Sequence, residues 1–261
     1  MFHFNVVAVM LVGFTLQMGN VAALSMPRAV SGLDNFDGLG LIGFPYNITQ
    51  DRFGTLQYDP EILATTFGGA TQKVFSVGIK PESGLNEAVF RSDVILSSPK
   101  KCVLLKSMYF GCNQRGVEPE INFPLSCDIK IEALGPKQAD GTEEVLYTTM
   151  KSFVPKLRVG IMPLKIFSPM EEVVIDPKPK VASKYRVSAL STDTRRANAF
   201  IKLVEDSGNL LEPLLKILGL TLGELVANLK ALLVKAGDEL VDLLIDNVTY
   251  ETDVDCPLLG S

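Results

Sequence analysis

Histidine is almost missing from this chain, and tryptophan is missing entirely. The 261 residues contain one histidine, His3, and no tryptophan. Imidazole is the commonest general base at neutral pH, a frequent zinc or copper ligand, and the partner of the nucleophile in serine and cysteine hydrolases. We expect His3 to be removed with a leader sequence. The mature chain therefore lacks Ser-His-Asp, Cys-His and histidine-ligated metal sites, which argues against an enzyme.

Long uncharged stretches are also missing, except at the amino terminus. No charged residue occurs between Phe4 and Leu24, and this segment contains an apolar run, Val6–Val12, and small residues up to Ala23. The run is short for a membrane span and is typical of the core of a signal peptide, although no basic residue precedes it. A transmembrane anchor is the alternative. We expect residues 1–23 to be a signal peptide, and the mature chain, without a membrane span, to be secreted or bound to the cell wall.

Basic side chains are few and dispersed. Lys and Arg number 25 against 30 Asp and Glu, which gives a formal net charge of -5. No basic stripe that would neutralise phosphates is present, so nucleic acid is not an expected partner. Polysaccharide and surface proteins remain as possible partners. The length fits one large domain, or one domain with an appendage.

All four cysteines, Cys102, Cys112, Cys127 and Cys256, lie in the expected mature chain. In an oxidising compartment they predict two disulfides, for which three connectivities exist. We favour Cys112 with Cys127, because short segments join them, which leaves Cys102 for Cys256. The alternative is that Cys102 and Cys256 stay reduced and buried.

Two glycosylation sequons occur, at Asn47 and at Asn247. Such a triplet accepts a glycan where a secreted protein exposes it in a loop. Asn47 follows Pro45 and Tyr46 in a predicted loop, so we predict a glycan there. Asn247 lies in a predicted strand, where the glycosyltransferase has poor access. The sequence therefore leaves open whether Asn247 carries a glycan.

Residues 24–176 have the pattern of an antiparallel β-sandwich or jelly roll, which makes the predicted fold mainly β. Alternation of period two is clearest in 127–134, and Asp140-Gly141 predicts a reversal into a second strand over 144–153. A turn is also predicted at Gly135-Pro136. The nearly all-apolar segment 102–112 favours a strand buried on both sides. Further short strands are predicted at 74–79, 89–96 and 171–175, and such strands broken by turn residues are typical of sandwiches.

Helical periodicity takes over after Asp176. A connector rich in Pro and Lys is followed by apolar residues at helical spacing and by leucine-dense stretches that end near Gly237. Thr221 and Glu224 form a predicted capping box. The segment 243–250 again has the pattern of a strand. We predict that 177–242 is a linker and an α-helical insertion, and that 243–261 supplies the last strand of the sandwich and a tail.

The helical insertion has two interpretations. In the favoured interpretation, its apolar stripes pack onto the sandwich or onto each other and form ordinary core. Otherwise they contact a lipid, a hydrophobic surface or a partner helix. Its polar face mixes Lys and Glu, unlike the basic face typical of helices that bind anionic membranes.

Carboxylates are the remaining candidates for catalysis. Glycosidases that need no histidine place two Asp or Glu side chains across a cleft. Many carboxylates are present and none stands in a distinctive motif; among them are Asp51, Asp59, Glu61, Glu82 and Glu87. Solvated surface charge is the favoured interpretation of each. We predict no catalytic residue and no cofactor.

Two weaker patterns concern ligand binding. Asp34, Asp37 and Asp246 would approach one another if the first and last strands are neighbours, and calcium accepts such ligands. Loop capping is the favoured role of these residues, so we predict no metal. Aromatic side chains in predicted loops would let a sugar stack, although packing against the sandwich edge is favoured for most of them; they are Tyr46, Phe53, Tyr58 and Phe67.

Three segments resemble a family of small secreted fungal proteins. They are LKSMYFGC at 105–112, SCDIKI at 126–131 and LLIDNVTY at 243–250. The resemblance implies a galactose-binding-type jelly roll, the architecture of many carbohydrate-binding modules, and a disulfide between Cys112 and Cys127. It covers neither the helical insertion nor the pair Cys102 and Cys256, and it carries over no catalytic residue.

These observations favour a secreted, non-catalytic binding protein that recognises cell-wall glycan or, in the manner of an effector, a host surface. One alternative is a structural or interaction protein of the cell surface that acts through its leucine-rich helical insertion. Another is a carboxylate-dependent hydrolase or lyase acting on glycan.

Overall fold

The computed structural model describes residues 29–37, 46–47, 56–59, 63–66, 75–84, 86–91, 93–99, 101–115, 122–161, 164–175, 180–190, 195–217, 219–236 and 241–256. The predicted signal peptide and the candidates Asp51, Phe53, Glu61 and Phe67 lie outside these described residues.

The largest sheet is built around the last strand of the chain. Its order is β14 (Glu171–Val174), β8 (Cys102–Arg115), β16 (Val241–Val254), β6 (Asn86–Arg91), β4 (Leu63–Thr66) and β2 (Tyr46–Asn47). Two more strands join it, β1 (Val30–Asp34) on β16 and β9 (Asn122–Leu125) on β8. All its pairings are antiparallel. The prediction that 243–250 pairs within the sandwich is confirmed, because β16 lies between β8 and β6.

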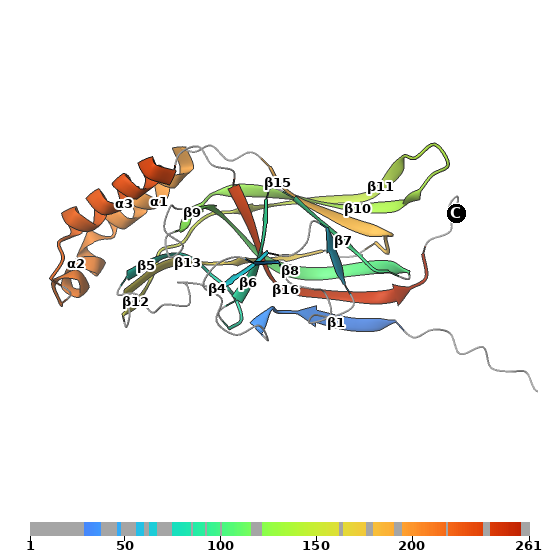
Figure 1. Cartoon of the computed structure of the whole chain (residues 1–261), viewed down its shortest axis with the longest axis horizontal. Coiled ribbons are helices and arrows are strands. Elements are labelled where there is room, and N and C mark those ends of the chain that lie inside the picture. Colours follow the sequence, from blue (N-terminus) through green and yellow to red (C-terminus); the bar gives the residue numbers. More distant parts are fainter. Residues whose placement is uncertain are drawn as a thin grey trace, which may run out of the picture.

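A second antiparallel sheet faces the first. Its order is β11 (Glu143–Phe153), β10 (Cys127–Lys137), β15 (Lys184–Leu190), β7 (Asp93–Ser97) and β3 (Gln57–Asp59). Figure 1 shows β10, β11 and β15 above β8, β16 and β1, as the layers of a sandwich. A small third sheet orders β12 (Arg158–Ile161), β13 (Leu164–Pro169) and β5 (Phe75–Lys80), with β13 and β5 parallel.

Three helices separate β15 from β16: α1 (Arg195–Asp206), α2 (Gly208–Ile217) and α3 (Leu222–Ala236). They form a layer at one end of the molecule (Figure 1), which we call the helical layer. The inward stripe of α1, Phe200, Ile201 and Val204, is part of the hydrophobic core, as are Leu211 and Leu215 of α2. The predicted fold class is confirmed: a mainly β, antiparallel sandwich with helices inserted before the last strand.

Alternating apolar residues fill the space between the two large sheets. Ile129 and Ile131 of β10 are fully buried, and so are Phe110 of β8 and Leu243 of β16. Phe110 meets Phe153 edge to face, with ring centroids 6.1 Å apart, so the two sheets are in contact. Full burial of each such side chain is worth about 1.5–3 kcal/mol, which explains why period-two segments became the central strands.

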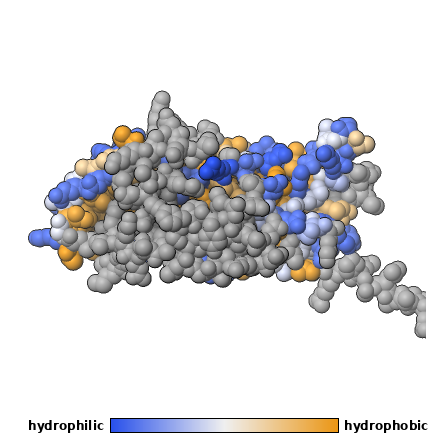
Figure 2. Space-filling model, viewed as in Figure 1, coloured by the Kyte–Doolittle hydropathy of each residue, from blue (hydrophilic) through white to orange (hydrophobic). Residues whose placement is uncertain are grey.

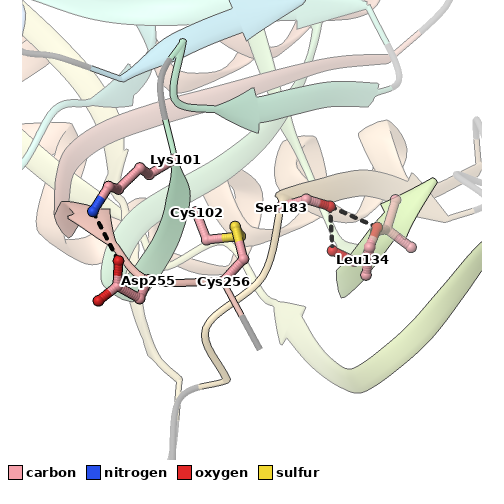
Figure 3. Close-up of a disulfide and its surroundings, with 7 residues drawn as sticks. Lys101, Cys102, Leu134, Ser183, Asp255 and Cys256 are labelled. Carbon is pink, nitrogen blue, oxygen red and sulfur yellow. Dashed lines mark hydrogen bonds and ion pairs between the residues drawn. A yellow bond between two sulfur atoms is a disulfide. The ribbon is translucent and has the colours of Figure 1, made fainter. Parts of the chain in front are cut away.

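Both favoured disulfides are present. Cys112 of β8 bonds to Cys127 of β10 and ties one large sheet to the other. Cys102, at the start of β8, bonds to Cys256, just after β16. Figure 3 shows this second bond together with the exposed ion pair of Lys101 and Asp255, whose Nζ and Oδ1 lie 2.8 Å apart. The two disulfides are typical of an oxidising, extracellular environment.

Four local predictions were inaccurate. Gly135 and Pro136 are part of β10, and the chain reverses at 138–142, where Gly141 has a φ of 85°. The predicted strand 89–96 is two strands, β6 and β7. Residues 184–190 were assigned to the linker and insertion, yet they form β15, paired with both β10 and β7. Tyr46 and Asn47 were placed in a loop, and they form β2.

Candidate functional site

Two acidic residues stand on one face of the central strand. Asp242 and Asp246 are four positions apart in β16, and side chains at even spacing in a strand point to the same face. The neighbouring strand β6 runs antiparallel, with Ile245 opposite Ala88, so the next step of the register places Asp246 opposite Glu87. With Asp37, which follows β1, these residues form what we call the carboxyl cluster: Asp37, Glu87, Asp242 and Asp246.

The two central carboxyls of the cluster, those of Asp246 and Glu87, are buried and only partly supplied with hydrogen bonds. Asp246 is 0% exposed and Glu87 2%. The turn between β5 and β6 reaches Asp246, since the Ser83 N–H and Oγ–H donate to its Oδ2 at 2.9 and 3.3 Å. Among the described residues, no hydrogen bond reaches Oδ1 of Asp246 or Oε2 of Glu87. An unsatisfied buried carboxylate oxygen is costly, so protonation of these groups is favoured.

Asp37 packs directly against the same turn. Gly84 has a φ of 45°, and a Cβ at this position would lie 1.8 Å from Oδ1 of Asp37. Only glycine combines this backbone conformation with so close an approach. The turn is therefore held on two sides, by Asp246 at Ser83 and by Asp37 at Gly84.

The electrostatics of the cluster favour bound protons. Burial raises the pKa of Glu87 well above its usual value, and the charges of Asp246 and Asp242 raise it further. Burial also raises the pKa of Asp246, to about 6; hydrogen bonds from Ser83 and Asn247 oppose this shift, and the charge of Asp37 adds to it. Burial and neighbouring negative charge therefore favour the protonated forms of Glu87 and Asp246.

Asp34 does not belong to this cluster, although it was grouped with Asp37 and Asp246 as a calcium candidate. Its carboxylate accepts hydrogen bonds from the phenols of Tyr58, 2.7 Å from Oδ2, and Tyr250, 2.9 Å from Oδ1. Among the described residues, no group of three or more His, Cys, Asp or Glu side chains is arranged to hold a metal ion. Asp34 thus has a structural role in joining β1, β3 and β16.

The aromatic candidates for sugar stacking do not form a described platform. Tyr58 lies in β3 and is buried, with its ring stacked on Phe90 at a centroid distance of 5.9 Å. Its packing is the core role that the sequence favoured for most of these residues. Tyr46 lies in β2, and its side chain is outside the described part, as are Phe53 and Phe67.

The candidate carboxylates for hydrolysis are likewise dispersed. Asp59 and Glu82 are exposed, on β3 and on the turn between β5 and β6, whereas Glu87 is buried in the carboxyl cluster. The sequon residue Asn47 lies in β2, and Asn247 lies half-buried at an irregularity of β16, with a φ of 47°.

The helical layer carries the most exposed apolar side chains of the described residues. Leu210 is 62% exposed, Ile217 79% and Val234 82%. Leu210 and Ile217 are seven positions apart in α2 and share its outer face with Pro213, which is also exposed. The opposite face of α2 buries Leu211 and Leu215, so this helix is apolar on both sides.

Charged residues of both signs surround this outer face. Glu212 and Lys216 are exposed on α2, and Lys230 of α3 pairs with Glu205 of α1, with Nζ 2.6 Å from Oε1. Figure 2 shows orange apolar atoms interspersed with blue polar ones over the helices. No helix of the described residues is long and apolar enough to cross a membrane.

Comparison with protein-family models, with curated proteins and with solved structures finds no match to this chain.

The sequence prediction missed most of the carboxyl cluster. Asp37 and Asp246 were grouped correctly, but Glu87 was interpreted as surface charge and Asp242 was not considered. One pattern points to the cluster: Asp242 and Asp246 are on the same face of a strand and enclose the apolar run Leu243–Ile245, where charge is unexpected. The role of Ser83 has no such pattern, because it lies 163 positions from Asp246.

Proposed function

We propose that this chain is a secreted, non-catalytic binding protein, and that the outer face of its helical layer binds a partner protein at a cell surface. The observation that carries the proposal is the exposure of Leu210 and Ile217 on a helix whose opposite face is already buried. Apolar side chains at this spacing are the anchors by which a helix enters a groove of another protein.

The charge around this face favours a protein over a membrane. Glu212 and Lys216 are exposed on α2, and an ion pair between Lys230 and Glu205 joins α3 to α1 in the same helical layer. Helices that bind anionic lipid have a predominantly basic polar face. A protein partner with an apolar groove and a mixed rim matches this surface better.

Glycan recognition, the other version of the binding hypothesis, receives less support. Tyr58 is buried and hydrogen-bonded to Asp34, so it is not available for a sugar. The resemblance to secreted fungal proteins with a jelly-roll fold is compatible with either kind of ligand. The disulfides support export, which the composition of residues 1–23 also favours.

Photo-crosslinking tests the proposal. A photoreactive residue is placed at Ile217 or, as a matched control, at Val174, which is exposed to a similar degree on β14. The labelled chains are applied to intact cells of the source organism and of any organism it contacts. We expect one protein to be crosslinked from position 217 and not from 174. Binding of that protein, once purified, should fall at least about tenfold in the Leu210→Glu variant.

Two results would contradict the proposal. One is equal crosslinking from both positions. The other is retention of the chain on chitin, β-glucan or cellulose that Leu210→Glu and Ile217→Glu leave unchanged, which would favour a glycan-binding module on the sandwich.

A further inference from the structure

The turn between β5 and β6, residues 81–84, is fastened to the centre of the larger sheet by carboxyl groups. Ser83 donates two hydrogen bonds to Oδ2 of Asp246, at 2.9 and 3.3 Å. Gly84 lies against Oδ1 of Asp37. The charge beneath this turn depends on how many protons the carboxyl cluster holds, because Asp37 acts on Asp246, and Asp246 and Asp242 act on Glu87.

Negative charge in this cluster is poorly balanced by hydrogen bonds. Three of its oxygens, Oδ1 of Asp246, Oε2 of Glu87 and Oδ1 of Asp37, are buried and accept no hydrogen bond from the described residues. Two adjacent carboxyls with unsatisfied oxygens are stabilised when they hold a proton, because like charges in a buried site repel strongly.

The groups that face the cluster from neighbouring elements are mostly acidic or neutral. On β6, Arg91 stands opposite Asp242 and is exposed. On β8, Tyr109 stands opposite Asp246 and Asn113 opposite Asp242. Glu82 on the turn and Glu172 on β14 lie close enough to Tyr109 to raise its pKa, after burial. Full ionisation of the cluster therefore concentrates negative charge beneath the turn.

We propose that the turn between β5 and β6 is a proton-operated latch, fastened to β16 while the carboxyl cluster holds at least one proton and released when the cluster is fully ionised. Loss of the proton to solvent leaves Glu87, Asp246 and Asp37 charged together. Their repulsion is relieved when Asp37 and Ser83 move outward and water enters. The turn is therefore closed on β16 in acid medium and open in mildly alkaline medium.

The burial of the two central carboxyls sets the direction of the response. In the folded chain the pKa of Glu87 and that of Asp246 are both raised, the latter to about 6. The closed turn therefore binds more protons than the open, hydrated one, so the closed fraction falls as the pH rises through the folded pKa values.

Amide hydrogen exchange of the full chain, followed by NMR at Ser83, whose N–H donates to Asp246, tests the latch. Observed rates are divided by the intrinsic rates, so that the pH dependence of the exchange chemistry cancels. We expect the protection of the Ser83 amide to fall at least about tenfold between about pH 5 and about pH 7.5. The amide of Ile131, in the centre of β10, should keep its protection and report that the sandwich stays folded.

Two variants distinguish release of the turn from a pH-dependent loss of stability of the whole fold. Glu87→Gln and Asp246→Asn each remove one ionisable carboxyl and keep its shape, and the amide oxygen introduced by Asp246→Asn can still accept from Ser83. We expect the pH-dependent loss of protection to disappear in both. Asp59→Asn, which changes an exposed carboxyl on the other large sheet, is the matched control and should behave as the parent chain. If either cluster variant does not fold, the other still decides the question.

The proposal is overturned if Ser83 keeps its protection across this pH range in the parent chain, or if both cluster variants lose protection as the parent does. A third measurement repeats the exchange experiment in millimolar calcium. Recovery of the Ser83 protection on adding calcium at about pH 7.5 would show that a cation, and not a proton, neutralises the cluster.

Discussion

Two kinds of buried carboxyl occur in this molecule, and they differ in what neutralises them. Asp34 accepts a hydrogen bond from each of two phenols, Tyr58 and Tyr250, so it is paired as a buried charge must be. Asp246 and Glu87 have oxygens without a hydrogen bond among the described residues. The sequence indicated that Asp37 and Asp246 come together, but burial of Glu87 depends on the alignment of β6 with β16, which no local pattern encodes.

The free energy of unfolding should fall as the pH rises through the titration of Asp246 and Glu87. Their pKa values are raised by folding, that of Asp246 to about 6, so the folded chain holds protons that the unfolded chain has released. The stabilisation is complete below the usual carboxyl range and is lost as the pH rises through the folded values. Urea unfolding at about pH 5 and about pH 7.5 measures this difference. Glu87→Gln should reduce the difference, and greater stability of the parent chain at the higher pH would refute the assignment.

A methyl group at Gly84 should be more costly than one at Gly219. Both glycines have a positive φ, 45° and 70°, so each Gly→Ala change has a backbone cost of about 1 kcal/mol. At Gly219 no atom lies within 4 Å of the new Cβ, whereas at Gly84 the Cβ would meet Asp37 at 1.8 Å. Unfolding in urea should show an additional loss of at least about 1 kcal/mol for Gly84→Ala. Equal losses of unfolding free energy in the two variants would mean that Asp37 does not pack closely against Gly84.

Elements with a strong local period were predictable, and those with a short or interrupted period were not. The hairpin of β10 and β11, the long strands β8 and β16, and the three helices all follow from apolar spacing in the sequence. β15 alternates Tyr185 and Val187, which are buried, with half-buried Arg186 and Ser188, but it is short and follows a proline-rich connector. Pro136 continues β10 because it lies beyond Leu134, the last residue of β10 that pairs with β15, so its missing N–H interrupts no bond on that side.

The capping box of α3 is a predicted element boundary that the structure confirms. The Glu224 N–H donates to Oγ1 of Thr221 at 3.2 Å, and the Thr221 N–H donates to Oε2 of Glu224 at 2.8 Å. Thr221→Ala should lower the free energy of unfolding by about 1 kcal/mol, whereas Thr221→Ser, which keeps the acceptor, should change it by a few tenths. Equal values for the two variants in urea unfolding would show that the cap does not stabilise α3.

At the scale of the whole molecule, the two disulfides and the last strand hold the sandwich together. β16 joins β1, β6 and β8, and the helical layer is an excursion between β15 and β16. Cys112–Cys127 links the two large sheets, while Cys102–Cys256 closes the chain from the first residue of β8 to just after β16. The helical layer adds its buried stripe to the core and leaves a second apolar stripe facing outward.

The two disulfides should contribute unequally to stability. Cys102–Cys256 spans 154 residues and Cys112–Cys127 spans 15. In the chain-entropy model the longer loop contributes about 5 kcal/mol and the shorter about 3 kcal/mol. Paired Cys→Ser variants compared by urea unfolding should therefore show the larger loss for Cys102 and Cys256. The reverse order would mean that linkage of the sheets outweighs loop closure.

Hydroxyl-radical footprinting of the chain in its cell-bound state shows which surface of the molecule contacts the partner. It measures the oxidation of exposed side chains on the helical layer and, for comparison, on the sandwich, where Met150 of β11 and Val174 of β14 are exposed. If the helical layer binds the partner, Leu210 and Ile217 become protected on binding, and Met150 and Val174 stay as reactive as in the free chain. Protection of Met150 or Val174 while Leu210 and Ile217 stay reactive would contradict the proposal, because the sandwich would then be the binding surface.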